Sequence, residues 1–411
     1  MKILKTLLDG WQTFLDRLPA GLDLDQTLRE FGGLKRRRRI GDAQTLLRLA
    51  LVYSLCGLSL RATAAWAQAQ GLAHLSDVAL MKRLGKAAPW LKHLLGAKLA
   101  QRTQGLKDDP GTRRLRIVDA TTCSVSGSRG TDYRIHMGFD LQALRVDQIE
   151  ITGPEGGESL TRQPFRPGDL VLADRGYAHR RGLASVLEAQ ADFLVRISWQ
   201  NLPLQDDQQH RIDLVQLVKG LDGEEVLDLD VWTVAAGKQG VGSMAARLIA
   251  VRKTKAALEV QRKKVQQEAG RKGRKADPQS LIAAEYVLLL TSVSRQELSA
   301  QKILDLYRLR WQIEMAFKRL KGLVLLDGLP SKNPDLVTSC LCAKLLAGLV
   351  LEDLTQDFLA FSPSGSLQSP EATEPVEDPA DPARCPDVLA PRVPQPIRAP
   401  GQSRGFDSSL P

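Results

Sequence analysis

The sequence is poor in the features that mark secreted, membrane-spanning and zinc-dependent proteins. Its five cysteines are scattered and odd in number, which argues against a disulfide framework and favours a reducing compartment. The start of the chain lacks the apolar core of a signal peptide. The most apolar stretch, Leu49 to Leu60, falls short of the roughly 18 apolar residues that a membrane span needs. The five histidines form no H-x-x-x-H pair, so a zinc hydrolase is not expected.

Positive charge, by contrast, is in excess and unevenly distributed. The 411 residues include 57 Lys and Arg against 47 Asp and Glu, a formal charge of +10. Residues 362–411 contain 11 of the 21 prolines and seven acids against four arginines, so this tail is at −3 and the rest of the chain at +13. A basic body favours a polyanion partner, for which nucleic acid is the common case, although a merely basic cytosolic protein has the same balance. The Pro-rich segment 361–411 is predicted to be disordered.

The first part of the chain, residues 1–108, is predicted to be an all-α domain. Apolar residues at helical spacing fill Asp42–Cys56 and stop at Gly57, and Ser59 can cap the next helix. Short helices with tight turns are typical of helix-turn-helix DNA readers, and the basic run from Lys35 to Arg39 supports that interpretation. An ordinary helical cap with a solvated charged face is the alternative.

After this domain the pattern changes to strands separated by turns and helices. Residues 109–198 and 286–360 are predicted to be the two parts of an α/β sheet domain. Residues 199–285 interrupt that domain with a β-rich insertion. The chain is therefore expected to be an α/β protein with an all-α N-terminal domain and a disordered C-terminal tail.

Two aspartates stand where predicted buried strands end. Asp119 closes the strand Leu115–Asp119, and Asp174 directly follows Leu170–Ala173. Carboxylates at the carboxyl ends of neighbouring strands share one edge of the sheet, where open α/β sheets bind ligands. With Glu314 from an adjacent helix, three oxygen donors can converge in a set that suits Mg²⁺. Either aspartate alone is more often a turn or cap residue.

One long helix is predicted from Ser299 to Lys321, and it carries the most informative side chains. Tyr307, Arg310, Glu314 and Lys321 share a face about 60° wide if each residue turns the helix by ~100°. A salt-bridge lattice would explain the charges, because Arg310 and Glu314 are four residues apart. It would not explain why Tyr307 lies on the same stripe.

These segments together resemble the bacterial insertion-sequence transposases classed as group four, the DDE family that includes the Tn-five type enzyme. The spacing Tyr307-x2-Arg310-x3-Glu314-x6-Lys321 matches the YREK signature of that family. The segment 117–122 (IVDATT) is similar to its first-aspartate segment and 172–177 (LADRGY) to its second. The resemblance covers roughly residues 30–355.

The resemblance implies a ribonuclease-H-like core interrupted by the β-rich insertion, and an N-terminal domain that binds the terminal inverted repeats. It implies that Asp119, Asp174 and Glu314 hold two Mg²⁺ ions, with Mn²⁺ as a substitute, during strand cleavage and strand transfer. The expected partners are double-stranded DNA, as transposon ends and as target, and a second copy of the chain in a dimeric synaptic complex. The expected location is the bacterial cytoplasm, away from membranes.

Further DNA contacts follow from the same resemblance. Tyr307, Arg310 and Lys321 inherit contacts to phosphates near the transposon end, for which arginine and lysine are suited. Some members form a hairpin and stack an extruded base on aromatic residues, and Trp199 and Trp311 are candidates for this role. The preferred interpretation is nevertheless that Trp311 packs in the helix core and that Trp199 caps a strand.

Two other classes of function share part of this evidence. A non-catalytic DNA-binding transposition inhibitor would keep the fold, as would an inactive remnant whose C-terminus was altered by a frameshift or fusion. Three carboxylates facing a polyanion argue against a pure binding role, since without metal they would repel phosphate. A metal-dependent nuclease without strand transfer would use the same site residues. The sequence favours a cut-and-paste DDE transposase.

Overall fold

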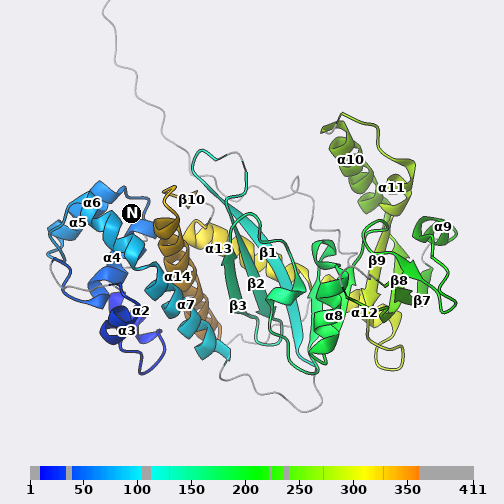
Figure 1. Cartoon of the computed structure of the whole chain (residues 1–411), viewed down its shortest axis with the longest axis horizontal. Helices are drawn as coiled ribbons and strands as arrows, with labels where there is room; N and C mark the ends of the chain where they lie inside the picture. Colours follow the sequence, from blue (N-terminus) through cyan, green and yellow to red (C-terminus); the bar gives the residue numbers. More distant parts are fainter. Residues whose placement is uncertain are drawn as a thin grey trace, which may run out of the picture. The chain divides into compact units, whose positions relative to one another are not determined.

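Helices and a large mixed sheet make up the computed structural model of the chain, which is a mixed α/β fold (Figure 1). The structure describes residues 10–33, 39–103, 113–128, 130–221, 225–235, 240–271, 273–326 and 328–360. The tail predicted to be disordered and all but the last residue of the Lys35 to Arg39 run lie outside the described residues.

The N-terminal helices begin and end at the residues that local chemistry favours. Asp42, Ser59 and Ser76 each accept a hydrogen bond from the backbone N–H three residues on, as N-caps do. Gly57 follows the first of these helices at a φ of +66°, which costs glycine little. The predicted helix, stop and cap in this region are therefore confirmed. The helices are α2 (Trp11–Asp16), α3 (Leu24–Glu30), α4 (Ala43–Leu55), α5 (Leu60–Ala69), α6 (Asp77–Lys86) and α7 (Ala88–Thr103).

The last helix, α14 (Pro334–Ala360), packs against α4, α6 and α7 although it is far away in the sequence (Figure 1). The Ser339 hydroxyl donates to the carbonyl of Leu84 at 2.6 Å, and the buried Lys98 ammonium lies 2.7 Å from Asp353. By length and composition α14 could cross a membrane, but 78% of its most apolar window is buried inside the protein. It is therefore a core helix that ties the N-terminal helices to the rest of the fold.

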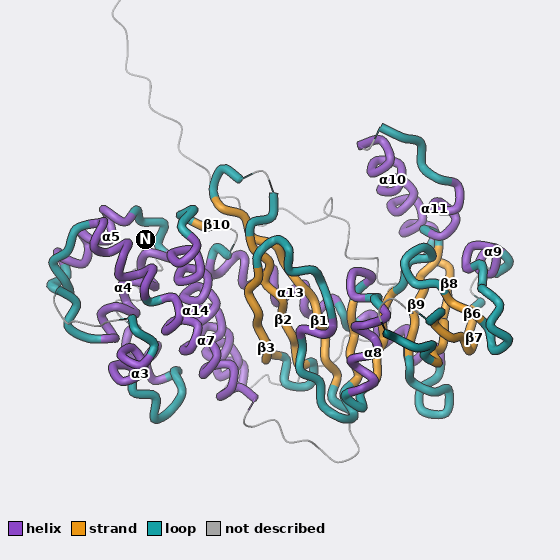
Figure 2. The backbone as a smooth tube through the Cα atoms, in the orientation of Figure 1, coloured by secondary structure: helices purple, strands orange, loops and turns teal. Residues whose placement is uncertain are grey.

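The sheet runs in the order β3-β2-β1-β4-β5-β9-β8-β7-β6, with β10 paired to the far end of β1. The first three strands form an antiparallel meander (Figure 2). Strand β4 pairs with β1 in parallel, and β5 pairs with β4 in parallel. The bounds are β1 (Leu115–Val125), β2 (Tyr133–Asp140), β3 (Arg145–Thr152), β4 (Leu170–Ala173), β5 (Asp192–Arg196), β6 (Leu204–Gln205), β7 (Val226–Thr233), β8 (Ala245–Arg252), β9 (Tyr286–Thr291) and β10 (Gly328–Leu329).

Strand β9 joins the strands of the predicted insertion to the same sheet. Its residues Leu289 to Thr291 pair with β5 on one side and with β8 on the other, both antiparallel. Every backbone group of a buried strand needs a hydrogen-bond partner. Strand β8 therefore pairs with β9, and β7 pairs with β8. The chain between β5 and β9 therefore extends the sheet.

Helices cover both faces of the sheet, as its alternating burial requires. Ile117 and Leu172 pack in one core with α13, whereas Val118, Val171 and Ala173 pack in a second core with α8. The remaining helices are η1 (Leu160–Arg162), η2 (Arg175–Tyr177), α8 (Arg180–Glu188), α9 (Leu214–Lys219), α10 (Lys255–Arg271), α11 (Pro278–Ala283), α12 (Ala300–Arg308) and α13 (Trp311–Val324).

Candidate active site

Sheet register brings the two predicted aspartates together. The last parallel pair between β1 and β4 is Val118 with Ala173, so Asp119 and Asp174 are the next residue on each strand path. Neighbouring strands lie about 4.8 Å apart, so these two residues are close neighbours. By the period of two, both aspartates follow Ile117 and Leu172 onto the face covered by α13.

The prediction that Asp119 ends its strand is wrong. β1 continues to Val125, because β2 pairs with it as far as Cys123 and β10 pairs with Ser124 and Val125. Only β4 stops at this level. There the chain turns at Asp174, whose Oδ1 accepts the Gly176 N–H at 2.7 Å. Asp119 thus lies within a rigid strand at the point where its neighbour ends.

The single long helix predicted from Ser299 to Lys321 is also wrong, because it divides into α12 and α13. Leu309 and Arg310 separate the two helices, and the backbone N–H groups of residues 309, 310, 312 and 313 bond to carbonyls three residues back. These tighter 3₁₀-type bonds replace the α-helical ladder locally and change the angle per residue. Tyr307 therefore belongs to α12, whereas Glu314 and Lys321 share one face of α13.

Arg310, at the junction, nevertheless keeps the predicted side chains in contact. Its guanidinium lies 2.5 Å from Glu314 Oε1, 3.8 Å from Asp119 Oδ2 and 5.9 Å from the centre of the Tyr307 ring. Although burial alone would lower the pKa of Arg310, the neighbouring Tyr307, Glu314 and Asp119 raise it. The guanidinium remains fully charged and bridges two acids from separate elements.

The negative charge of the Asp119 carboxylate is not fully compensated by the cations around it. Burial, with repulsion from Asp174 and Glu314, raises its pKa to about 7, even though the Ala120 N–H and Arg310 act in the opposite direction. Its side chain is only 16% exposed. A cation placed among these acids would relieve this cost.

Tyr307 and Lys321 flank the acids from the two helices. The Tyr307 ring packs against the core, and burial raises its pKa to about 12, with Arg310, Arg196 and Asp174 among the charges around it. Lys321 lies half-buried in the last turn of α13, seven residues from Glu314. The structure thus gathers Asp119, Asp174, Tyr307, Arg310 and Glu314 in one region and places Lys321 farther along the same helix face.

The metal set is less complete than the sequence suggests. Within the described residues, no three His, Cys, Asp or Glu side chains are already placed to hold one ion. Asp119 and Asp174 each follow the last paired residue between their two strands, whereas Glu314 is linked to Asp119 through Arg310. Arg310 takes the charge-balancing position between the strand and the helix.

The two tryptophans differ in their surroundings. Trp311 is the first residue of α13 and 40% exposed, so the preferred interpretation that it packs in the core is wrong. It stands at the tightened junction, where part of its side chain is open to solvent. Trp199 is half-buried against the core under α8, which agrees with a structural role after β5.

Sequence reasoning missed two residues beside the aspartates, Glu158 and Tyr177. Glu158 precedes η1 in a loop, and its pKa is raised by burial and by Asp174. Tyr177 is fully buried, and its hydroxyl has no hydrogen-bond partner among the described residues. The position of Tyr177 three residues after Asp174 was a visible signal, whereas nothing in the sequence around Glu158 marks it.

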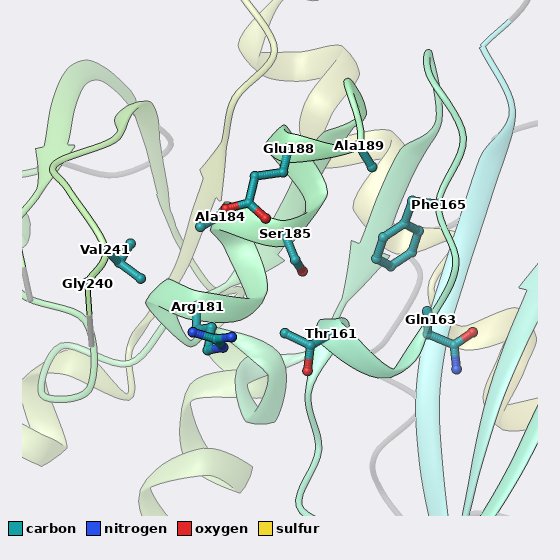
Figure 3. A pocket seen from close by; sticks show the side chains of 10 residues that line it. All are labelled: Thr161, Gln163, Phe165, Arg181, Ala184, Ser185, Glu188, Ala189, Gly240 and Val241. Atoms are coloured by element: carbon teal, nitrogen blue, oxygen red, sulfur yellow. The ribbon is translucent and has the colours of Figure 1, made fainter. Parts of the chain in front are cut away.

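A cavity of about 310 Å³ lies elsewhere, beside α8 (Figure 3). Arg181, Ser185 and Glu188 of α8 line it, together with Thr161 near η1 and Val241 from the chain before β8. No predicted site residue lines this cavity. The candidate site at the end of β4 is therefore separate from this cavity.

Comparisons with known proteins identify the family of the chain. The model of the family described as a transposase DDE domain matches residues 110–348. The putative transposase InsL for insertion sequence element IS186A of Escherichia coli (strain K12) is 39% identical over 357 residues, which cover 86% of this chain and 96% of that protein. The transposase for insertion sequence element IS421 of Escherichia coli is 39% identical over 358 residues, with the same coverage.

A piggyBac transposase synaptic complex with hairpin DNA is similar in structure at a TM-score of 0.39 and 7% identity, over 84% of this chain and 74% of that one. The sequence matches define the class, an insertion-sequence transposase with a DDE domain. The chain belongs to the DDE transposase family, and it is an enzyme of that family. The prediction made from its three acidic segments is confirmed at this level.

Proposed function

We propose that this DDE transposase is a cut-and-paste enzyme of the group-four type. It binds terminal inverted repeats and catalyses metal-dependent strand cleavage followed by strand transfer. One observation carries the proposal: Asp119 and Asp174 occupy adjacent register positions, and Arg310 connects Asp119 to Glu314. These elements are far apart in the sequence, so an ordinary helical salt bridge does not account for their meeting.

The residues fit a divalent cation by their chemistry. Carboxylate oxygens are the ligands that Mg²⁺ and Mn²⁺ prefer, and the buried Asp119 lacks sufficient positive charge around it. Asp119, Asp174 and Glu314 would hold two Mg²⁺ ions, or Mn²⁺ in their place. When bound, such ions activate the attacking oxygen and stabilise the leaving oxygen during in-line displacement at phosphorus.

The protein's own groups have separate tasks. Asp119 lies on a strand paired on both sides, so its carboxylate is held rigidly. Arg310 can make forked contacts to phosphate, and turning towards DNA would release Glu314 to join the aspartates. Lys321 supplies a point charge on the same face of α13, and Tyr307 holds Arg310 in place through its ring.

The two tryptophans and the separate domains have proposed roles in binding DNA. The exposed Trp311 is the better stacking candidate for an extruded base, and Trp199 the weaker one. Residues 1–108 would bind the transposon ends, and the meander that continues into parallel β4 and β5 supports a ribonuclease-H-like core. Residues 199–285 are the proposed insertion. Two copies would pair the ends in a synaptic complex on target DNA.

Nicking of end DNA tests the catalytic assignment. Asp119→Ala, Asp174→Ala and Glu314→Ala should each abolish Mg²⁺-dependent nicking of a duplex that carries the element's inverted repeat, while end binding in a gel-shift assay persists. The exposed Asp207→Ala serves as the matched control and should nick normally. Full cutting by any of the first three variants would remove that residue from the site. Joining of cut ends to a target duplex separates a transposase from a nuclease.

A further inference from the structure

A fourth carboxylate, that of Glu158, lies beside Asp174. A side chain on residue 176 would collide with Glu158 Oε2 and would lie 3.1 Å from Asp174 Oδ1. Gly176 therefore lets two acids from different segments approach the same point. The Glu158 carboxylate reaches the site from the loop before η1, whereas Glu314 belongs to α13.

Glu158 has no strong charge partner of its own within the described chain. The guanidinium of Arg134 lies 3.9 Å from Glu158 Oε1, beyond hydrogen-bond distance, and His179 is the other basic group that acts on this carboxylate. Arg134 instead donates to the Gly156 carbonyl at 3.3 Å. The Glu158 side chain is 31% exposed, so its oxygens are open to a ligand from solvent. An ordinary salt bridge therefore does not account for this partly buried carboxylate, because no cation compensates its charge at hydrogen-bond distance.

Tyr177 provides an independent indication of a missing ligand at the same place. The side chain is fully buried, and its hydroxyl has no hydrogen-bond partner in the described structure. The acids that act on this hydroxyl are Asp119, Glu158 and Asp174, and Arg134 acts on it in the opposite direction. Buried hydroxyls are normally paired, and an unpaired one among three acids is expected where a bound group orders the surrounding oxygens.

We propose that Glu158 is a further ligand of the divalent cation held by Asp119 and Asp174, and that the Tyr177 hydroxyl donates a hydrogen bond to this acidic cluster once the cation is bound. The inference rests on the proposed function. Small side-chain rotations complete the set, since no three acids of the described chain surround one point beforehand. Glu314 is held by Arg310 until DNA is bound, so the first ion in the DNA-free protein uses Glu158.

Mn²⁺ binding to the full chain without DNA tests this order of events. Free Mn²⁺ is measured by electron paramagnetic resonance during a titration. Glu158→Gln should raise the Mn²⁺ dissociation constant by about tenfold or more, the scale of effect seen when groups around a metal are lost. Glu155→Gln, an exposed acid in the same loop, is the matched control and should bind as the wild type does. Glu314→Gln should change DNA-free binding by less than Glu158→Gln.

The outcomes separate this inference from the proposed function. Wild-type Mn²⁺ affinity in Glu158→Gln, with binding lost in Asp119→Asn, would overturn the inference and leave the aspartate site standing. Wild-type affinity in both Asp119→Asn and Asp174→Asn would overturn the site itself. If Glu158→Gln does not fold, Glu158→Asp keeps the charge but shortens the reach, and unchanged affinity in that variant would equally overturn the inference. Tyr177→Phe should weaken Mn²⁺ binding without loss of the fold, and unchanged affinity would contradict the donor role.

Discussion

The charge of Asp119 is predicted to destabilise the metal-free protein at neutral pH. Its pKa is raised from 3.8 to about 7, so the folded state holds this proton more tightly than the unfolded state does. The corresponding stability is fully present below about pH 4 and is lost as the pH rises through 7. Asp119→Asn keeps the shape of the side chain and removes its titration. Without metal, the variant should therefore lack this pH-dependent loss.

The size of the effect follows from the same values. A change in pKa from 3.8 to about 7, at about 1.36 kcal/mol per unit, corresponds to at most about 4 kcal/mol in the free energy of unfolding. The side chain is 16% exposed, so water screens it little. A loss of this size is a large fraction of the stability of a typical domain. It should be visible in denaturation curves.

Urea unfolding between pH 4.5 and 8 in the presence of a chelator measures this pH-dependent change in the free energy of unfolding. The wild type should lose stability across this range, and Asp119→Asn should lose markedly less. Asp207→Asn, at an exposed position, should follow the wild type. Millimolar Mg²⁺ at pH 7.5 should stabilise the wild type but not Asp119→Asn. Parallel pH curves for the wild type and Asp119→Asn would refute the reasoning.

Three further predictions concern α13 and its surroundings. Lys321→Ala should weaken binding of end DNA and reduce the slope of log K against log salt by about 1, and an unchanged slope would exclude a phosphate contact. Trp311→Ala should weaken binding of end DNA by about 1–3 kcal/mol in a gel-shift titration with little change in melting temperature, and lowered stability with unchanged binding would instead indicate packing. Lys344 is buried and donates to the Leu325 and Gly328 carbonyls at 2.5 Å each. Lys344→Met should therefore lower the free energy of unfolding, measured by urea denaturation, by about 1–3 kcal/mol. An unchanged free energy of unfolding would contradict this role.

Local patterns predicted most elements of the fold. The helix over α4, its end at Gly57 and the cap at Ser59 are set by neighbouring residues, so they could be read directly. Strand β4 was likewise visible as a short apolar run. The break between α12 and α13 was not, because it depends on packing: α12 lies against β5, whereas α13 lies against β1 and α14. Two separate docking surfaces require the tighter turn between them.

The candidate site divides in the same way. The acids Asp119, Asp174 and Glu314 could be named from the apolar runs before the two aspartates and from signature spacing, because these depend on residues close in the sequence. Glu158 could not, because it lies in a loop whose residues have no periodic pattern. Its approach to Asp174 depends on the missing side chain of Gly176.

The sequence by itself determined which carboxylates, cations and aromatic residues this transposase possesses, and in what order along the chain. Only the tertiary structure decided that Asp119 and Asp174 are register neighbours, that Arg310 links Glu314 to Asp119, and that Trp311 faces solvent. The physical reason is range. Helix caps and strand patterns act over a few residues, whereas the position of a charge in a site follows from sheet register and burial between distant segments.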